Sequence, residues 1–123
     1  MAWEVETEPE VTDWYRTLSA SERDVAAVHI DLLAEFGHRL RMPHARPLGE
    51  GLMELRFDMS RRSWRVTYWY RPDGVIVLLT VFHKQRNNEA RQVARARAAL
   101  AVCRRQHEQA PTDTADAKER NSP

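Results

Sequence analysis

The segment at residues 75–82, VIVLLTVF, constrains the fold more than any other part of the chain. It is apolar on both alternating faces, which is typical of a central β-strand whose two faces are covered by other elements. The segment before it, WRVTYWYR at 64–71, separates an apolar row from a mixed row and is followed by Pro-Asp-Gly at 72–74, a strong hairpin signal. We therefore expect these two segments to pair as antiparallel strands.

Shorter patterns predict the other elements. Two stretches with capping-box spacing, TEPE and SASE, each indicate the start of a helix. Two alternating segments indicate further strands, and an Ala-rich segment indicates a last helix. The expected elements are a strand at 3–5, helices at 8–18 and 19–36, strands at 52–58, 64–71 and 75–82, and a helix from 87 or 88 to about 109.

This order of elements predicts an α+β domain built on a small antiparallel or mixed sheet of about four strands. We expect the two N-terminal helices to pack on one face of the sheet, and we expect a C-terminal helix in addition. A chain of 123 residues fits one domain, which should span residues 1–109. Residues 110–123 carry no large apolar side chain and are expected to form a disordered tail.

The net charge of +1 conceals a segregation of charge along the chain. Residues 1–35 hold nine acidic and two basic residues, whereas residues 36–105 hold fifteen basic and five acidic residues. Nearly all of these bases are arginine, whose forked donors suit phosphate and whose plane stacks on nucleic-acid bases. The pattern indicates a polyanionic partner, although a GC-rich genome, which favours arginine codons, would give a similar composition.

A sheet face that is left partly open would bring several of these arginines together. Period-two alternation places Arg56 on one strand and Arg65, Trp69 and Arg71 on the next, with all four side chains on the same side. We expect this face to be the functional surface. The alternative is purely structural: the arginines would cover exposed strand surface and pair with nearby acids such as Glu54, contributing little energy.

The sequence gives no sign of a membrane segment or a cofactor site. Its longest apolar stretch is too short to cross a bilayer, and the start MAWEVETEPE is acidic where a signal peptide would be basic and then apolar, so we expect a cytoplasmic protein. Cys103 has no partner at metal-ligand spacing and is interpreted as a packing residue. His29 interrupts an apolar helical stripe and is interpreted as a hydrogen-bonded packing residue. His38, His44 and His107 have no partner in sequence, so no metal or other cofactor is expected.

The segments GLMELRFD, WRVTYWY, IVLLTVFHKQRNNE and ARQVARARAAL follow one another along the chain. Together they resemble toxins of the RelE/ParE superfamily, in its HigB-like, phage-derived branch, over about Trp3 to Cys103. The resemblance implies a toxin held inactive by an antitoxin encoded beside it, often one with a helix-turn-helix DNA-binding domain. Related toxins bind the ribosome and cut messenger RNA, whereas ParE-like relatives poison DNA gyrase without being nucleases. A fold alone does not choose between these functions.

Metal-free RNA cleavage uses the 2′-hydroxyl of the substrate as nucleophile, so the protein has to accept a proton, neutralise the phosphate and help the 5′-oxygen leave. Arg56 and Arg65 are the candidates for stabilising the charged phosphorane. Lys84 would neutralise the phosphate or act as base, and its alternative role is to solubilise a strand end. His83 has the intrinsic pKa best suited to acid/base catalysis, but strict alternation places it on the opposite face from Lys84.

Five further side chains are candidates for binding RNA: Arg61, Arg62, Trp69, Arg71 and Arg86. The first two lie in the loop DMSRRS, where a glycine-rich turn would be typical of the family. Trp69 would stack on an RNA base or receive a segment of the antitoxin. Because antitoxins of this family often cover the basic face of the toxin, we expect a partner segment to lie across Arg56, Arg65 and Trp69.

The expected function is that of a toxin that inhibits translation by ribosome-dependent cleavage of messenger RNA, as a metal-independent endoribonuclease. Its expected partners are a cognate antitoxin, the ribosome and messenger RNA. Two alternatives stay open: a gyrase-poisoning toxin that acts by binding, and a non-toxic RNA-binding remnant of phage origin. The segment HKQRNNE has one lysine and one arginine where many relatives have several lysines, which thins the basic cluster of a nuclease. The sequence does not predict the oligomeric state.

Overall fold

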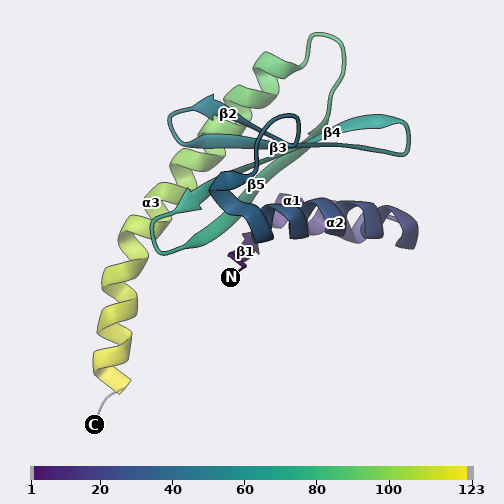
Figure 1. Ribbon diagram of the computed structural model, residues 1–123. Helices are drawn as coiled ribbons and strands as arrows, with labels where there is room; N and C mark the ends of the chain where they lie inside the picture. The colour runs from purple at the N-terminus through teal and green to yellow at the C-terminus, as the bar shows by residue number, and fades with distance from the viewer. Residues whose placement is uncertain (1, 122–123) are drawn as a thin grey trace.

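The computed structural model describes the backbone of residues 2–121 and the side chains of residues 2–109. Its centre is a five-stranded sheet in the order β1-β5-β4-β3-β2 (Figure 1). The strands are β1 (Glu4–Thr7), β2 (Ala45–Gly49), β3 (Leu52–Met59), β4 (Arg62–Arg71) and β5 (Val75–His83). Strand β1 runs parallel to β5, and the other neighbours are antiparallel, so the sheet is mixed.

The α+β class is confirmed, and the sheet has one strand more than the sequence predicted. The extra strand is β2, within a segment that its prolines and glycines marked as irregular. Pro47 lacks a backbone donor, but it lies in an edge strand, where a missing ladder hydrogen bond is tolerated. The register shifts between Pro47 and Gly49, which is the irregularity that obscured the strand in the sequence.

The helices are α1 (Pro9–Thr17), α2 (Ala20–Phe36), the 3₁₀ turn η1 (Gly37–Arg39) and α3 (Glu89–Asn121). The capping box predicted for α2 is formed: the Ser19 hydroxyl accepts from the Glu22 backbone N–H, and the Glu22 carboxylate accepts from the Ser19 N–H. The capping box predicted for α1 is wrong. Its N-cap is Glu8 rather than Thr7, and Glu8 makes no side-chain capping bond; the Glu10 carboxylate accepts a hydrogen bond from the Val81 N–H instead.

Strand β5 is covered on both faces, as its apolar sequence predicted. On one face, Ile76 and Leu78 belong to a core that includes residues of α1 and α2. On the other face, Val75, Val77 and Leu79 belong to a second core beneath α3. Figure 1 shows this arrangement, with α1 and α2 on one side of the sheet and α3 on the other. The prediction that the two N-terminal helices share one face is therefore confirmed.

Strand β1 covers only half of the β5 edge, because its register ends where Thr7 pairs with Leu78. Two side chains cover the edge beyond this point. The Glu10 carboxylate of α1 accepts from the Val81 N–H at 2.9 Å, and the Arg95 guanidinium of α3 donates to the Val81 carbonyl at 3.3 Å and to Glu10. The exposed polar groups of the strand are satisfied without a further strand.

Two other arginines of α3 are also structural. Arg97 donates to the carbonyls of Leu48 and Gly49 at 2.5 and 3.2 Å, and Arg104 donates to the carbonyl of Glu50 at 2.7 Å. These bonds fasten the β2–β3 turn to the helix. Part of the basic character of the C-terminal segment therefore serves the fold, and it is not available to a ligand.

Helix α3 extends to Asn121 in the backbone, past the end predicted near Gln109. The side chains of residues 110–123 lie outside the described part of the chain, so the disordered tail predicted there remains a prediction. Among the described residues, none of the helices combines the length and the apolar character needed to span a bilayer.

Candidate active site

A polar cavity of about 500 Å³ opens where β3 extends past the start of β2. Strand β2 pairs with β3 only as far as Leu55, and the backbone N–H of Arg56 then donates to the carbonyl of His44, the residue just before β2. The edge of the sheet is left open at this point, next to helix α2. The cavity is lined by His29, Pro43, His44, Arg56, Phe57, Asp58, Ser63 and Arg65.

Arg56 and Arg65 lie side by side at this cavity, as the alternation of the two strands predicted. They are direct partners in the register between β3 and β4, so their side chains emerge on the same face. Arg65 is nearly buried, with 8% of its side chain exposed, and its Nη1 donates to the carbonyl of Trp64 at 3.0 Å. Arg56 is the more accessible of the two, at 24%. The sheet thus places two guanidinium groups together at one wall of a cavity.

Glu54 lies two positions before Arg56 on the same face and is completely buried. Its Oε1 is 3.7 Å from Nε of Arg65 and 3.8 Å from Nε of Arg56, which is close enough for an ion pair but too long for a hydrogen bond. Burial raises the pKa of Glu54, against the lowering effect of Arg65 and Arg56. One buried carboxylate therefore serves two cations and holds them at the cavity.

The positive charges of the two arginines also repel each other. Burial lowers the pKa of Arg65, the charge of Arg56 lowers it further, and Glu54 acts in the opposite direction. Arg65 remains charged at neutral pH because an ordinary guanidinium titrates above 12. An anion that enters the cavity would relieve the repulsion between the two guanidinium groups.

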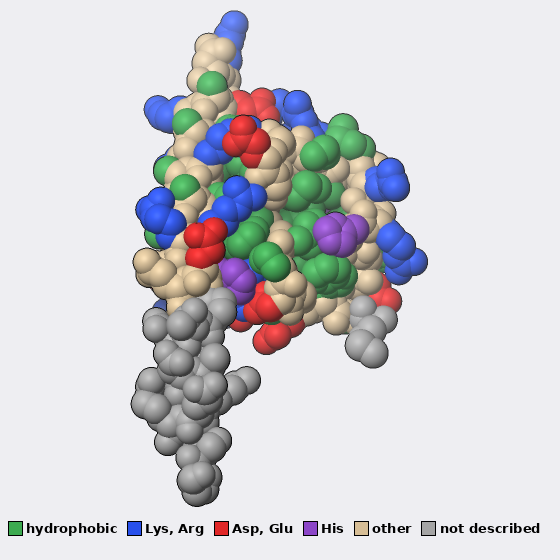
Figure 2. All heavy atoms as spheres, turned by 90° about the vertical axis from the view of Figure 1, so that its left-hand side faces the viewer, with side chains coloured by type: hydrophobic (Ala, Val, Ile, Leu, Met, Phe, Trp, Pro, Cys, Tyr) green, Lys and Arg blue, Asp and Glu red, His purple; other side chains and the backbone are tan. Residues whose placement is uncertain are grey.

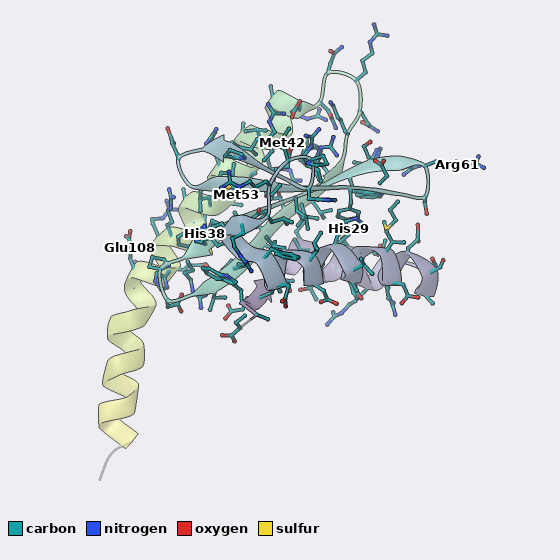
Figure 3. The ribbon with its side chains drawn as sticks, in the orientation of Figure 1. His29, His38, Met42, Met53, Arg61 and Glu108 are labelled. Carbon is teal, nitrogen blue, oxygen red and sulfur yellow. The ribbon has the colours of Figure 1, made fainter. Side chains whose placement is uncertain are left out.

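Two histidines that are distant in the sequence also meet at this cavity. The ring of His29, from α2, stacks on Phe57 with centroids 4.8 Å apart and planes within 15°. Its Nδ1 bonds to the carbonyl of Val25 at 2.9 Å, so the interpretation of His29 as a hydrogen-bonded packing residue is confirmed. The exposed ring of His44 has its centroid 6.5 Å from that of His29. Figure 3 shows that His29 points from α2 toward the sheet.

The sequence did not indicate that these histidines meet. His29 occupies a helical position and His44 a loop position, and their contact depends on how α2 packs against β3. The one available signal was that His29 lies on the side of α2 that faces the sheet.

His83 does not join the arginine pair. It is opposite Trp64 in the register between β4 and β5, with ring centroids 5.5 Å apart, so it lies on the other face of the sheet from Arg65. Lys84 is exposed, and its backbone N–H donates to the carbonyl of Ser63 at 2.7 Å. This bond places Lys84 at the same end of the sheet as the arginine pair. The predicted separation of His83 from Lys84 stays a prediction.

The expectation that Trp69 lies on an open face of the sheet is wrong. Only 5% of its surface is exposed, since α3 lies over it. Its indole N–H donates to Sγ of Cys103 at 3.3 Å, and the guanidinium of Arg104 lies 5.4 Å above its ring. The prediction that Trp69 stacks on RNA or receives an antitoxin segment is wrong for this arrangement. Cys103 is a buried packing residue, as predicted.

Arg71 is likewise separated from the arginine pair. It lies six positions from Arg65 along β4, about 20 Å at the usual rise per residue. Its guanidinium donates to both carboxylate oxygens of Asp73 and to both of Glu6. The bonds to Asp73 are the main reason that the pKa of Arg71 is raised, and those to Glu6 add to it. Its donors are directed at protein carboxylates, so the expectation that it shares a phosphate-binding surface with Arg65 is wrong.

Arg61, Arg62 and Arg86 are exposed and remain predictions as RNA-binding residues. Arg61 occupies the tip of the β3–β4 hairpin in a left-handed backbone conformation, with φ of 65°, and points away from the body of the molecule (Figure 3). Arg62 starts β4 at the same end of the sheet as Arg65. Arg86 lies in the turn after β5, near Lys84. These cations surround the end of the sheet that holds the cavity.

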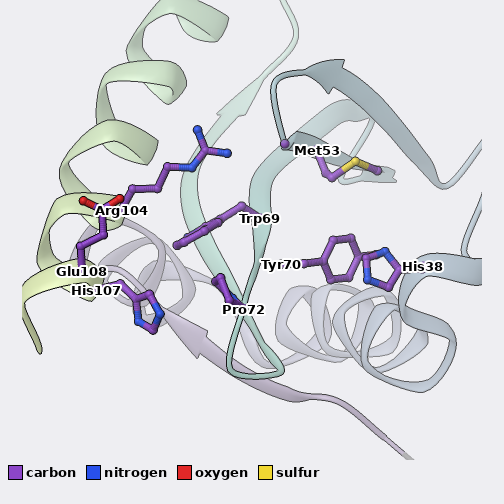
Figure 4. Close-up of a pocket in the computed structure, with 9 residues that line it drawn as sticks. His38, Met53, Trp69, Tyr70, Pro72, Arg104, His107 and Glu108 are labelled. Atoms are coloured by element: carbon purple, nitrogen blue, oxygen red, sulfur yellow. The ribbon is translucent and has the colours of Figure 1, made fainter. Parts of the chain in front are cut away.

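A second cavity, of about 590 Å³, lies at the opposite end of β4, and it is mainly apolar. Trp69, Tyr70 and Met53 contribute to its lining, and Arg104 and His107 of α3 lie at one side (Figure 4). Figure 2 shows apolar side chains gathered beside α3 on this side of the molecule. Within the described residues, no group of three or more His, Cys, Asp or Glu side chains is placed to hold a metal ion.

Residues 13–105 match the protein family described as "Phage derived protein Gp49-like (DUF891)". The chain belongs to this family. No curated protein matches the sequence. Among solved structures, a mutant of E. coli toxin RelE in the free state aligns with a TM-score of 0.56 at 16% identity, covering 78% of this chain and 94% of that one. The toxin–antitoxin complex RelBE2 from Mycobacterium tuberculosis aligns with a TM-score of 0.49 at 17% identity, covering 68% of this chain and 100% of that one.

The family match confirms the phage-derived family that the resemblance implied, and the alignment with toxin RelE confirms the fold. At 16% identity the structural likeness assigns no role to any side chain of this protein.

Proposed function

We propose that this Gp49-like protein is the toxin of a toxin–antitoxin system, and that it inhibits translation by cleaving messenger RNA on the ribosome without a metal ion. Membership of the phage-derived family and the fold shared with toxin RelE support the assignment as a toxin. One observation carries the nuclease part of the proposal. Arg56 and Arg65 lie side by side over a buried carboxylate, at the wall of an open polar cavity.

The chemistry of RNA cleavage fits this pair. When the 2′-oxygen attacks the adjacent phosphorus, the phosphorane gains negative charge that the ground-state phosphate lacks. Two preorganised guanidinium groups would stabilise that charge without reorganising, and one such donor is worth roughly 100-fold or more in rate. Glu54 keeps both groups in place before the substrate arrives.

The arrangement favours catalysis over binding alone. A surface that only binds a polyanion spreads its cations along the phosphates, whereas Arg56 and Arg65 are adjacent and partly desolvated. Their mutual repulsion is relieved most by the state with the largest negative charge, which is the transition state. This difference between the ground state and the transition state is what accelerates a reaction.

The proposed partners are a cognate antitoxin of the helix-turn-helix type, the ribosome and messenger RNA, which would place the action of the toxin in the cytoplasm. We propose that an acidic antitoxin segment covers the cavity at Arg56, the more accessible arginine of the pair. Trp69 is not part of this contact, since α3 lies over it.

The decisive experiment is to induce the protein in growing bacteria and map the 5′ ends of cellular transcripts. We expect cuts within translated frames and arrest of growth. The double variant Arg56→Ala and Arg65→Ala should lose both effects, provided that circular dichroism shows it to be folded. A matched control is Arg105→Ala, which removes an exposed arginine of α3 away from the cavity.

Three results would contradict the proposal. DNA breaks and an SOS response without transcript cuts would identify a gyrase poison. Absence of growth arrest and of cuts by the wild-type protein would identify a non-toxic relative. Growth arrest that persists in the folded double variant would show that the arginine pair is not the active site.

A further inference from the structure

We infer that Asp58 is the proton acceptor of the RNA-cleaving site, and that Ser63 orients its carboxylate. This inference rests on the proposed function, because it assigns the proton transfer from the 2′-hydroxyl at the same cavity. Asp58 takes the place of His83 and Lys84 as the candidate base. His83 lies on the other face of the sheet from Arg65, and the residues that line the cavity do not include Lys84.

The alternation of β3 and β4 places this carboxylate on the same face of the sheet as the arginine pair. Phe57 of β3 and Trp64 of β4 are partners in the register, and both pack in the core next to α1 and α2. Successive side chains of a strand point to opposite faces. The residues on either side of each aromatic therefore share the other face, the one on which α3 packs: Arg56 and Asp58 on β3, and Ser63 and Arg65 on β4.

Asp58 and Ser63 form the next cross-strand pair on this face after Arg56 and Arg65. The Ser63 hydroxyl donates to Oδ1 of Asp58 at 3.0 Å, which orients the carboxylate. Within the described part of the chain, no ion pair involves Asp58, and no side chain other than that of Ser63 donates to it. The second oxygen, Oδ2, is therefore available to a molecule in the cavity that Asp58 lines.

Glu54 and Asp58 are both carboxylates next to the arginine pair, but they are placed for different tasks. Glu54 is completely buried and serves both arginines as an ion-pair partner. Asp58 is exposed and lies at the wall of the cavity. A general base has to come within hydrogen-bond reach of the proton that it removes. Asp58 meets this requirement for a substrate in the cavity, and the burial of Glu54 prevents it.

The spacing of Asp58 from the arginines suits a single nucleotide. Asp58 and Arg56 are two positions apart on β3, which is about 7 Å at the usual rise per residue. In RNA the 2′-hydroxyl and the 3′-phosphate are carried by neighbouring carbons, so the nucleophile and the phosphate lie side by side. The guanidinium groups are thus placed to bind the phosphate while the carboxylate reaches the 2′-hydroxyl. A cavity of about 500 Å³ lies within the usual range for ligand pockets.

The negative charge of Asp58 would be a disadvantage in a surface that only binds RNA, because a carboxylate repels phosphate. Burial lowers the pKa of Arg65, and the charge of Asp58 is among those that oppose this effect, so its field reaches the arginine pair. In a catalytic site the same charge is useful. Asp58 becomes neutral as it accepts the proton, and the negative charge moves to the phosphorane, where Arg56 and Arg65 stabilise it.

The reaction step balances in atoms and protons. Oδ2 of Asp58 takes the proton of the 2′-hydroxyl as the 2′-oxygen forms a bond to phosphorus. The bond between phosphorus and the 5′-oxygen breaks, and a solvent water at the open side of the cavity gives a proton to that oxygen. The hydroxide that remains takes the proton back from Asp58, so the carboxylate and the water are both regenerated. The products are a 2′,3′-cyclic phosphate and a 5′-hydroxyl.

The test uses purified toxin released from its antitoxin, with single-turnover cleavage of a defined messenger RNA at a series of concentrations of programmed ribosomes. Asp58→Asn keeps an oxygen that accepts from Ser63 and removes the base. We expect its maximal rate to fall about 100-fold or more. Its half-saturating ribosome concentration should stay the same or fall, because a repulsive charge is lost. The matched control is Asp31→Asn, which changes an exposed aspartate of α2 outside the cavity and should keep both wild-type values.

Rescue by a small carboxylate separates a base from a structural residue. Asp58→Ala leaves space where the carboxylate was, so added formate should restore its cleavage in proportion to the formate concentration. Asp58→Asn should not respond, because its amide fills that space. Ser63→Ala should lower the maximal rate by less, roughly tenfold, since one hydrogen bond that orients the carboxylate is lost. Asp58 is exposed, so both of its variants should fold, which circular dichroism checks.

The outcomes distinguish this inference from the proposed function. If wild-type protein cuts ribosome-bound messenger RNA and Asp58→Asn cuts it at the same maximal rate, the assignment of Asp58 is wrong and the nuclease assignment stands. The same conclusion follows if Asp58→Asn only binds ribosomes more weakly, or if formate leaves Asp58→Ala as slow as before. If wild-type protein cuts no messenger RNA, the proposed function itself is wrong.

Discussion

The two ends of β4 both carry arginines, but they treat the guanidinium groups differently. At the end of β4 that leads into the β4–β5 turn, Arg71 binds two carboxylates. Arg104 of α3 binds a carbonyl there and lies over Trp69. At the other end, Arg56 and Arg65 share one buried carboxylate at ion-pair distance and face a polar cavity. The number of arginines in a segment therefore does not locate a site. What locates it is whether their donors already have protein partners.

The difference between the two ends of β4 is tested most strongly by replacing one arginine at each end in turn. We expect Arg65→Ala to lower the rate of messenger RNA cleavage roughly 100-fold or more, because one preorganised donor to the phosphorane is lost. The matching change Arg71→Ala should leave the cleavage rate per folded molecule unchanged, since its partners are Glu6 and Asp73. Single-turnover cleavage on programmed ribosomes measures both. Equal losses in the two variants would erase the distinction drawn between the two ends.

Trp69 sharpens the comparison through stability. We expect Trp69→Ala to lower the free energy of unfolding by about 3–5 kcal/mol, because it leaves a cavity beneath α3. Chemical denaturation measures this change. Trp69→Phe is the matched control, since it keeps most of the apolar volume and loses the bond to Cys103. A stable Trp69→Ala protein with impaired RNA binding would instead support the original expectation that this indole contacts RNA.

A substitution of Arg104 tests whether the arginines near the β4–β5 turn are structural. We expect Arg104→Ala to destabilise the protein by about 1–2 kcal/mol, since the carbonyl of Glu50 loses a charge-assisted hydrogen bond. Amide hydrogen exchange should become faster in the β2–β3 turn, while β5 stays protected. Exchange that is unchanged in this turn would show that Arg104 does not fasten it.

Glu54 gives the smallest effect, and its direction depends on pH. Because burial raises the pKa of Glu54 in the folded protein, its favourable contribution is complete below the pKa of an unfolded glutamate, about 4.3, and is lost as pH rises through the folded pKa. The stability of the wild-type protein relative to Glu54→Gln should therefore fall as pH rises from about 4. Denaturation midpoints at a series of pH values measure this difference. A difference that grows with pH would mean that the arginine pair dominates over burial.

The sequence predicted the parts of this molecule that depend on local alternation. The two-sided apolar pattern of β5, the β4–β5 hairpin and the shared face of Arg56 and Arg65 all follow from period two, and all are present. The class of fold and the family resemblance followed from the order of these patterns.

The predictions that failed have a common cause: they depend on which elements pack over a surface in the folded protein. The rows of β4 placed Trp69 on the same face as Arg65 correctly, but they could not show that α3 lies over Trp69. The meeting of His29 and His44 depends on how α2 packs on β3, and no spacing in the sequence encodes it. The partners of Arg71 and Arg95, which are Glu6 and Glu10, also lie far away along the chain.

The covering of β5 beyond β1 has a consequence for how the protein behaves at high concentration. An uncovered strand edge can accept a strand from another copy and so begin sheet-to-sheet association. At Val81 this role is blocked by one carboxylate from α1 and one guanidinium from α3, which also bind each other. Protection of this edge therefore depends on two side chains, and loosening either helix would leave Val81 free to pair with a strand of another copy.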